Sequence, residues 1–152
     1  MSTPAAPPVF PAACVVDASV LIKLFLPEQD SDLAMALFEM PLIGTVVRAA
    51  PDLIYLECAN ILRTRVHRGL LTVDDARARA IQLAALPLAW YATPPLLTTT
   101  INHALNWRIS AYDAAYAALV DTLEAPLITA DSVLAGKLSG AGISVLDLAS
   151  FR

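Results

Sequence analysis

Cysteine and histidine are both scarce in this chain of 152 residues, which contains two of each. Cys14 and Cys58 lie far apart, show no CxxC spacing and have no histidine pair near them. A structural zinc site needs four such ligands at short, paired spacings, so the sequence argues against one. A single disulfide is one alternative. Our prediction is that both thiols are reduced and occupy small core positions.

A long uninterrupted apolar run is also missing, although 57% of the residues are hydrophobic and the mean hydropathy is +0.62. The longest uncharged stretch, residues 80–107, is interrupted by Pro87, Pro94 and Pro95. A membrane-spanning helix requires about 20 consecutive apolar residues, so we predict no membrane segment. The surplus of apolar residues instead suggests a partner or an oligomer.

The first twelve residues lack the basic residue that begins a signal peptide, and they contain four prolines. We interpret residues 1–12 as a proline-rich arm and residues 13–152 as one domain, a usual size for a single core. With no targeting segment recognised, we expect a cytoplasmic protein.

Positive charge is in deficit: the net charge is −4, from 14 acidic residues and 10 lysines and arginines. A basic face is the usual mark of a nucleic-acid-binding protein, so the total argues against one. Setting aside four acids that we assign below to a single site leaves ten acids against ten bases. Five arginines also fall within residues 63–79, so the charge is patterned.

Short apolar runs alternate with helical patterns along the chain. Strands are predicted at residues 13–17, 45–49, 88–92, 127–130 and 143–146. Helices are predicted at residues 19–26, 28–40, 51–69, 72–86, 96–107, 111–124 and 132–138. This alternation predicts an α/β fold in which a central parallel sheet of four to five strands lies between two helical layers. The strands are continuous apolar runs, as expected when both faces of a sheet are covered.

Proline, glycine and threonine define the predicted ends of several helices. Pro41 and Gly44 are expected to break the chain before the second strand. Pro51 stands at the predicted start of the helix 51–69 and Gly69 at its end, which are positions that these residues favour. Thr72 is expected to cap the following helix.

Four acidic residues have positions that favour one shared site. Asp17 and Asp131 each follow an apolar strand, and the carboxyl ends of parallel strands open onto the crevice of such sheets. Glu57 lies among apolar residues of the helix 51–69, and Asp113 lies at the start of a later helix. Each acid alone also suits a helix cap or a solvent-facing helix stripe. Their combination predicts convergence on one pocket.

Carboxylates do not cluster without a counter-charge, because two of them about 4 Å apart repel by roughly 4 kcal/mol at an effective dielectric constant near 20. Carboxylate oxygens and water are the ligands that Mg²⁺ or Mn²⁺ prefers. One or two such ions can position a water for in-line attack on a phosphodiester. We therefore predict that Asp17, Asp113 and Asp131 are metal ligands, and that Glu57 is a ligand or the base that orients the water.

Three polar residues are predicted to support this site. Ser19 and Thr129 lie beside the two strand-end acids, where their hydroxyls could hold a carboxylate or the phosphate. Asn60 lies one helical turn after Glu57 and is predicted to brace it.

Four segments resemble the signature blocks of PIN-domain nucleases, and most of all those of the VapC toxins of bacterial and archaeal toxin–antitoxin pairs. They are VVDASVLIK (15–23), PDLIYLECANIL (51–62), SAYDAAY (110–116) and LITAD (127–131). Their order and spacing agree over roughly residues 13–148; each block alone is weak, but together they are specific. The proline-rich arm is longer than such toxins usually carry.

The resemblance implies a PIN-like three-layer fold and a Mg²⁺-dependent endoribonuclease. It also implies a homodimer and a small VapB-like antitoxin whose tail covers the acidic groove. In this interpretation four cations are candidate RNA contacts, because phosphate contacts supply most of the affinity for RNA: Lys23, Arg63, Arg65 and Arg68. A solvated pair of helices is the alternative for them. Four aromatic residues are assigned to the core or to an interface: Trp90, Trp107, Tyr112 and Tyr116.

Three other functions stay open at this point. A phosphohydrolase with Asp17 as nucleophile would call for a second aspartate two residues later, where this chain has Ser19. A PIN-domain nuclease of RNA processing would need no antitoxin, and a non-catalytic PIN-like module would need no metal.

Overall fold

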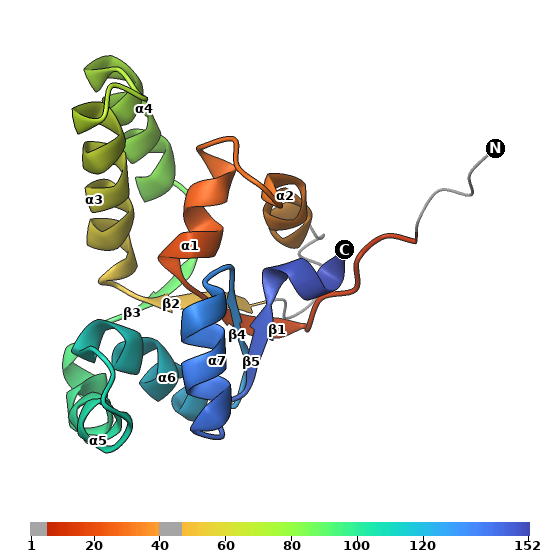
Figure 1. The fold of residues 1–152 in the computed structure, drawn as a ribbon, viewed down its shortest axis with the longest axis vertical. Coiled ribbons are helices and arrows are strands. Elements are labelled where there is room, and N and C mark those ends of the chain that lie inside the picture. The colour runs from red at the N-terminus through yellow and green to blue at the C-terminus, as the bar shows by residue number, and fades with distance from the viewer. Residues whose placement is uncertain (1–5, 40–46) are drawn as a thin grey trace.

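The computed structural model describes residues 6–39 and 47–152 (Figure 1). Its centre is one sheet of five parallel strands in the order β3-β2-β1-β4-β5. The strands are β1 (Ala13–Val16), β2 (Val47–Pro51), β3 (Ala89–Tyr91), β4 (Leu127–Thr129) and β5 (Val145–Asp147). This confirms the predicted α/β class and the parallel sheet.

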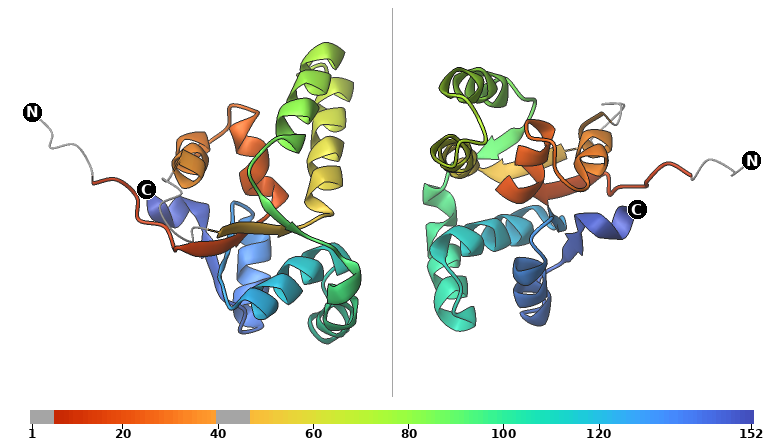
Figure 2. Two further views of the ribbon diagram at one scale, coloured as in Figure 1. Left: turned by 180° about the vertical axis from the view of Figure 1, so that it is seen from behind. Right: turned by 45° about the horizontal axis from the view of Figure 1, so that its top comes forward.

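Helices cover both faces of the sheet (Figures 1 and 2). One face carries α1 (Ala18–Leu21), α2 (Ser31–Glu39), α3 (Ile54–His67) and α4 (Val73–Ala84). The opposite face carries α5 (Leu97–Trp107), α6 (Ala111–Leu123) and α7 (Ser132–Gly140). The described residues also form three short 3₁₀ helices: η1 (Ile22–Leu24), η2 (Pro94–Leu96) and η3 (Leu148–Phe151). The three-layer prediction is therefore correct.

The middle strand β1 determines where the site forms. It pairs with β2 on one side and with β4 on the other, so the strand order reverses between β1 and β4. Val16 lies beside Ile128 in this pairing, which brings Asp17 next to Thr129. Ligand sites of open parallel sheets lie beyond the strand ends at such a reversal. The loops after β1 and β4 meet there.

Pro51 corrects one predicted boundary. It is the last residue of β2, opposite Tyr91 of β3, and α3 begins only at Ile54. Proline cannot donate to a strand ladder, but the pairing of β2 with β1 runs only from Val47 to Ala49, so Pro51 lies beyond it. The next residue, Asp52, resumes the pairing by donating its N–H to the Tyr91 carbonyl at 2.8 Å.

Two other boundary predictions are confirmed. Gly69 follows α3 with a φ of +69°, a conformation that glycine adopts without strain, and its N–H donates to the Val66 carbonyl at 2.9 Å. Thr72 caps α4, where its hydroxyl accepts from the N–H of Asp75 at 3.1 Å. The α3–α4 hairpin therefore has the ends that its sequence predicts.

The second helix is shorter than predicted, because α2 begins at Ser31 rather than at Glu28. Asp30 has a φ of 63°, which a helix cannot accommodate, and the Ser31 hydroxyl accepts from the Glu28 N–H at 2.9 Å. The expected breaks at Pro41 and Gly44 lie outside the described residues.

The two cysteines occupy small core positions, as predicted. Cys14 and Cys58 are buried, and burial raises the pKa of the Cys58 thiol to about 12, which keeps it protonated. Phe10, within the predicted arm, is buried with its ring centroid 4.6 Å from that of Phe151.

Within residues 6–39 and 47–152, no helix is long and apolar enough to cross a bilayer.

Candidate active site at the carboxyl ends of β1 and β4

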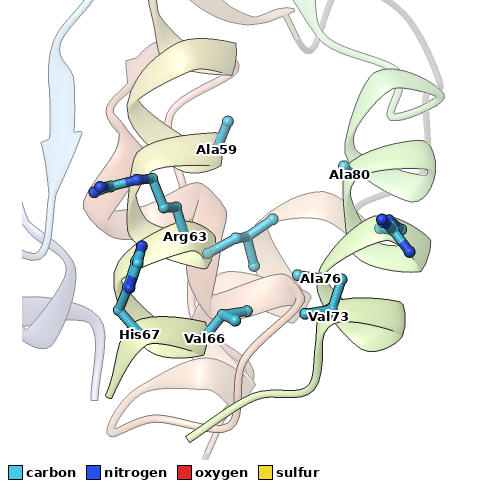
Figure 3. A pocket seen from close by; sticks show the side chains of 9 residues that line it. Ala59, Arg63, Val66, His67, Val73, Ala76 and Ala80 are labelled. Atoms are coloured by element: carbon cyan, nitrogen blue, oxygen red, sulfur yellow. The ribbon is translucent and has the colours of Figure 1, made fainter. Parts of the chain in front are cut away.

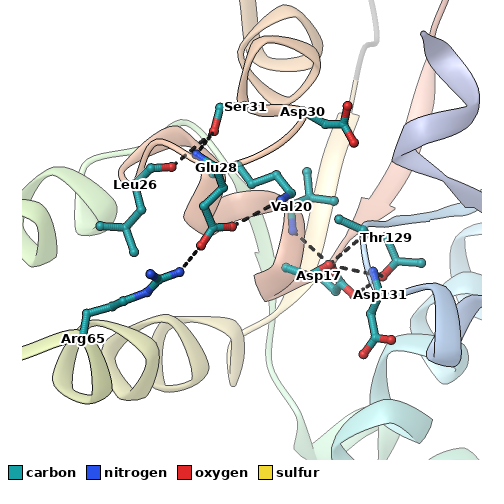
Figure 4. Close-up of polar contacts among 12 residues, drawn as sticks. Asp17, Val20, Leu26, Glu28, Asp30, Ser31, Arg65, Thr129 and Asp131 are labelled. Carbon is teal, nitrogen blue, oxygen red and sulfur yellow. Dashed lines mark hydrogen bonds and ion pairs between the residues drawn. The ribbon is translucent and has the colours of Figure 1, made fainter. Parts of the chain in front are cut away.

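Asp17 is the most enclosed acid of the candidate site. It follows β1 directly, caps α1 and is only 5% exposed. Its Oδ1 accepts from the Ser19 hydroxyl at 2.6 Å and from the Val20 N–H at 3.3 Å, and its Oδ2 accepts from the Thr129 hydroxyl at 2.5 Å (Figure 4). Both carboxylate oxygens are therefore held in place by donors from two adjoining segments.

Ser19 and Thr129 tie the loop after β1 to the loop after β4. The Ser19 hydroxyl accepts from the N–H of Ala130 at 2.9 Å, and the Thr129 hydroxyl accepts from the N–H of Asp131 at 3.0 Å. The two hydroxyl oxygens lie 3.3 Å apart. The pair therefore orients Asp17 through its side chain and Asp131 through its backbone.

Asp131 and Asp113 both serve helix starts as well as the pocket. Oδ1 of Asp131 caps α7 by accepting from the N–H groups of Val133 and Leu134, each at 3.0 Å. Asp113 lies in the first turn of α6, where its own N–H donates to the Ser110 hydroxyl at 3.1 Å. The simpler helix-cap interpretation is thus compatible with a shared site, because Asp131 caps α7 through only one of its two carboxylate oxygens.

Glu57 points from α3 toward α6, and a tyrosine holds it there. Tyr116 is 2% exposed, and its phenolic hydroxyl donates to Oε2 of Glu57. The sequence assigned this brace to Asn60, whose side chain is exposed on the next turn of α3. In the structure Tyr116 makes this hydrogen bond instead. Tyr116 lies on the facing helix α6, and its long, rigid ring reaches the Glu57 carboxylate from the buried side. The sequence did contain a signal for Tyr116: it follows Asp113 by three residues and therefore lies on the same face of α6 as that acid.

All four predicted acids line a single cavity of about 160 Å³. Each acid comes from a different part of the fold: the β1 end, α3, α6 and the β4–α7 loop. The remaining wall consists of Ala18, Ser19, Tyr116 and Leu134.

The electrostatics of this cavity are those of crowded carboxylates. Burial raises the pKa of Asp17, hydrogen bonds from Ser19, Thr129 and the backbone oppose that rise, and the charge of Asp131 adds to it. Burial likewise raises the pKa of Glu57; the Tyr116 hydroxyl opposes the rise, while Asp17 and Asp113 increase it.

Asp113 shows the same pattern. Burial and then the neighbouring Asp131 raise its pKa, whereas the Ser110 hydrogen bond and Lys137 lower it. Three of the four acids thus disfavour their charged form in the absence of a cation.

The donor set fits a hard divalent cation. Carboxylate oxygens alone make up its charged groups, and a cation between them would relieve the repulsion that raises their pKa values. Across the described part of the chain, no three His, Cys, Asp or Glu side chains are grouped closely enough to hold an ion as they stand. Water-mediated ligation or a side-chain adjustment would therefore accompany binding, as is common for Mg²⁺, which retains several waters.

The four predicted RNA-contacting cations do not line this cavity. Lys23 and Arg65 both pair with Glu28, at 3.2 and 2.5 Å (Figure 4). Arg63 lies beside the groove between α3 and α4, and Arg68 is exposed at the end of α3. Arg63 thus shares a groove with Arg77 of α4, whereas Arg65 pairs with Glu28 and Arg68 stays exposed.

The groove between α3 and α4 is mostly apolar (Figure 3). It has a volume of about 290 Å³, and Leu62, Val66, Val73 and Ala76 are among its lining residues. His67 and the arginines of the two helices lie at its margin.

The four aromatic residues assigned to core or interface differ in environment. Tyr116 is in the core, and the half-buried Trp107 stacks on His103 with ring centroids 4.0 Å apart. Trp90 and Tyr112 are more than half exposed, which excludes a core role for them.

Known proteins share this fold and these segments. The family model of the PIN domain matches residues 14–137. The chain is 35% identical over 128 residues to Ribonuclease VapC3 of Pyrobaculum aerophilum, covering 81% of this chain and 92% of that protein. The chain therefore belongs to the PIN-domain family, and within that family it is similar to the VapC ribonucleases.

Two solved structures have the same fold. The crystal structure of PAE2754 from Pyrobaculum aerophilum aligns with a TM-score of 0.64 at 25% identity, covering 91% of this chain and 93% of that one. A toxin–antitoxin complex from Klebsiella pneumoniae contains a chain that aligns with a TM-score of 0.60 at 15% identity, covering 89% and 97%.

Proposed function

We propose that this chain is a Mg²⁺- or Mn²⁺-dependent endoribonuclease that hydrolyses RNA phosphodiester bonds, as the toxin of a VapBC-type toxin–antitoxin pair. The observation that carries the proposal is the convergence of Asp17, Glu57, Asp113 and Asp131 on one cavity. The similarity to VapC ribonucleases supports the same chemistry.

In this proposal Asp17, Asp113 and Asp131 hold the metal, directly or through water. When bound, the ion supplies positive charge for the phosphodiester and lowers the pKa of a coordinated water. Asp17 needs little reorganisation, because Ser19 and Thr129 already orient both of its oxygens.

Glu57 is the group that we assign to the attacking water. Tyr116 donates to Oε2, which leaves Oε1 to accept a proton or a hydrogen bond from that water. The raised pKa of Glu57 strengthens it as a proton acceptor relative to an ordinary surface carboxylate. The Tyr116 hydroxyl keeps the Glu57 carboxylate in one orientation.

The phosphohydrolase alternative, with Asp17 as nucleophile, lacks its second aspartate. The position two residues after Asp17 holds Ser19, whose hydroxyl donates to Oδ1 of Asp17.

A small antitoxin and a second copy of the chain are the protein partners that we propose. The apolar groove between α3 and α4 suits the apolar face of a partner helix (Figure 3). Exposed Leu97, Ile101 and Leu105 recur along α5 at four-residue intervals, a pattern that suits contact with a second copy. A cytoplasmic location follows from the proposed RNA substrate.

The test is cleavage of a mixed RNA pool by purified, antitoxin-free protein. Mg²⁺ should support cutting, and either EDTA or Asp113→Asn should abolish it. Asp113 is the preferred position because asparagine keeps an oxygen that can accept the Ser110 hydrogen bond and leaves the backbone N–H contact to Ser110 unchanged, so the variant should fold normally. Equal cleavage by the variant, or by wild type in EDTA, would refute the proposal.

A further inference from the structure

A second cavity adjoins the acidic one. It has a volume of about 430 Å³ and is lined by Leu53, Leu56, Glu57, Asn60 and Tyr112. Glu57 lines both cavities, so a ligand that reaches the acidic cavity lies next to this second one.

Adjacent residues of α6 serve the two cavities. Asp113 lines the acidic cavity and Tyr112, one residue earlier, lines the second. Successive helical residues project about 100° apart, so a single helix turn presents a carboxylate to one cavity and an aromatic ring to the other.

The lining of the second cavity combines exposed apolar side chains with polar groups. Leu56 is 77% exposed and Tyr112 is 65% exposed, so neither side chain is needed for the core. Asn60 adds an exposed amide that both donates and accepts hydrogen bonds. An aromatic ring, an aliphatic wall and one amide form the set with which proteins bind an unpaired nucleobase.

We propose that this second cavity binds one unpaired nucleobase of the RNA, immediately next to the phosphodiester bond that lies in the acidic cavity. Tyr112 stacks on the base, Leu56 packs against it, and Asn60 bonds to its edge. The inference rests on the proposed function, since it places the base relative to the cleaved bond. The proposal implies that the substrate RNA is unpaired at the cleavage site, because unpairing and unstacking a base to place it in the cavity costs free energy.

The test combines a protein variant with a substrate variant. The cleavage site is first mapped with wild type, and RNA oligonucleotides are then made with one abasic nucleotide on either side of the cut. Wild type should cleave one of these two about 10- to 100-fold less efficiently in kcat/KM than the intact RNA. Tyr112→Ala should lose the same factor on the intact RNA and little more on that abasic RNA, because ring and base form one contact.

Matched variants separate stacking from other causes. Tyr112→Phe retains the ring, so it should recover most of the kcat/KM that Tyr112→Ala loses. Ile81→Ala removes an equally exposed apolar side chain from α4, away from both cavities, and should change nothing. Asn60→Ala should alter which base is preferred at the cut more than the overall rate.

Binding without metal makes the result independent of cleavage. In EDTA, Tyr112→Ala should bind single-stranded oligonucleotide about tenfold more weakly, measured by fluorescence anisotropy, with Ile81→Ala as control. If the kcat/KM losses caused by Tyr112→Ala and by the abasic nucleotide multiply when the two are combined, ring and base do not contact each other and the proposed base site is wrong. The proposal is also wrong if Tyr112→Ala changes only self-association or protein binding. If wild type binds in this tyrosine-dependent way yet cleaves nothing, the base cavity stands and the nuclease proposal fails.

Discussion

The phenolic hydroxyl of Tyr116 on α6 donates a hydrogen bond to Oε2 of Glu57 on α3, across the acidic cavity that both residues line. Tyr116 is almost fully buried, so this contact is part of the packing between the two helices and is set before any substrate arrives. It makes Tyr116 a positioning residue for the carboxylate that we assign to the attacking water.

Tyr116→Phe should therefore lower kcat about tenfold, with a smaller change in KM, and should raise the Mg²⁺ concentration needed for half-maximal rate. The ring stays and only the hydroxyl is lost, so the fold should survive. Tyr91→Phe, a half-buried tyrosine on β3, is the control and should leave both quantities unchanged. An unaltered metal dependence in Tyr116→Phe would show that the contact is structural only.

Asp17→Asn should raise the melting temperature in EDTA by about 2–4 °C, which corresponds to about 1 kcal/mol for a domain of this size. Burial and the charge of Asp131 raise the pKa of Asp17, so the folded protein is destabilised when this carboxylate is ionised. An amide still accepts from Ser19 and can donate to Thr129. The same variant should lose the Mg²⁺-induced rise in melting temperature; a variant that melts lower than wild type in EDTA would contradict this account.

The stability difference between Asp17→Asn and wild type in EDTA should increase with pH. A carboxyl group whose pKa is raised by folding binds more protons in the folded state, so its contribution favours folding at low pH and is lost as the pH rises through the raised value. The stability gain of Asp17→Asn over wild type in EDTA should accordingly be small near pH 4 and larger at pH 7. Thermal unfolding across this range measures it, and a gain that shrinks with rising pH would reverse the argument.

Thr129→Val should cost about 1–3 kcal/mol of stability and most of the activity. The hydroxyl of Thr129 donates to Asp17 and accepts from the Asp131 N–H, and valine keeps the shape but offers neither bond. Thr122→Val is the matched control, because the Thr122 hydroxyl donates to the Ala118 carbonyl within its own helix, away from the acidic cavity. Denaturant unfolding and RNA cleavage report the two effects, and equal losses in both variants would count against a special role for Thr129.

Glu28→Gln should strengthen RNA binding at low salt. Glu28 engages both Lys23 and Arg65, so its neutralisation releases two cations beside the α1–α3 face. The slope of log affinity against log salt should steepen by about 0.7 for each cation that then reaches a phosphate. Glu39→Gln makes the same change in net charge at an exposed position of α2 and should produce a smaller effect. Equal slopes in the two variants would mean that Lys23 and Arg65 do not reach RNA.

The sequence by itself determined the features that depend on neighbours along the chain. Apolar runs identified the buried strands, and acids directly after them identified Asp17 and Asp131, because parallel strands end at a common edge. The Gly69 terminus and the Thr72 cap were equally readable, since each is made within one turn of helix. Four signature segments identified the family before any contact was known.

Tertiary structure alone decided which distant groups meet. Tyr116 reaches Glu57 across 59 positions of sequence, and Glu28 reaches Arg65 across 37. The spacing of Tyr116 from Asp113 places both on one helix face, but no local pattern names the distant partner of Tyr116 or of Glu28. Pro51 closed a strand instead of opening a helix for the same reason: its partner is a residue of β3, forty positions further along the chain. Local propensity is a short-range property, whereas the choice of partner depends on how helices and strands pack, and that packing is what gathers four separate carboxylates into one cavity.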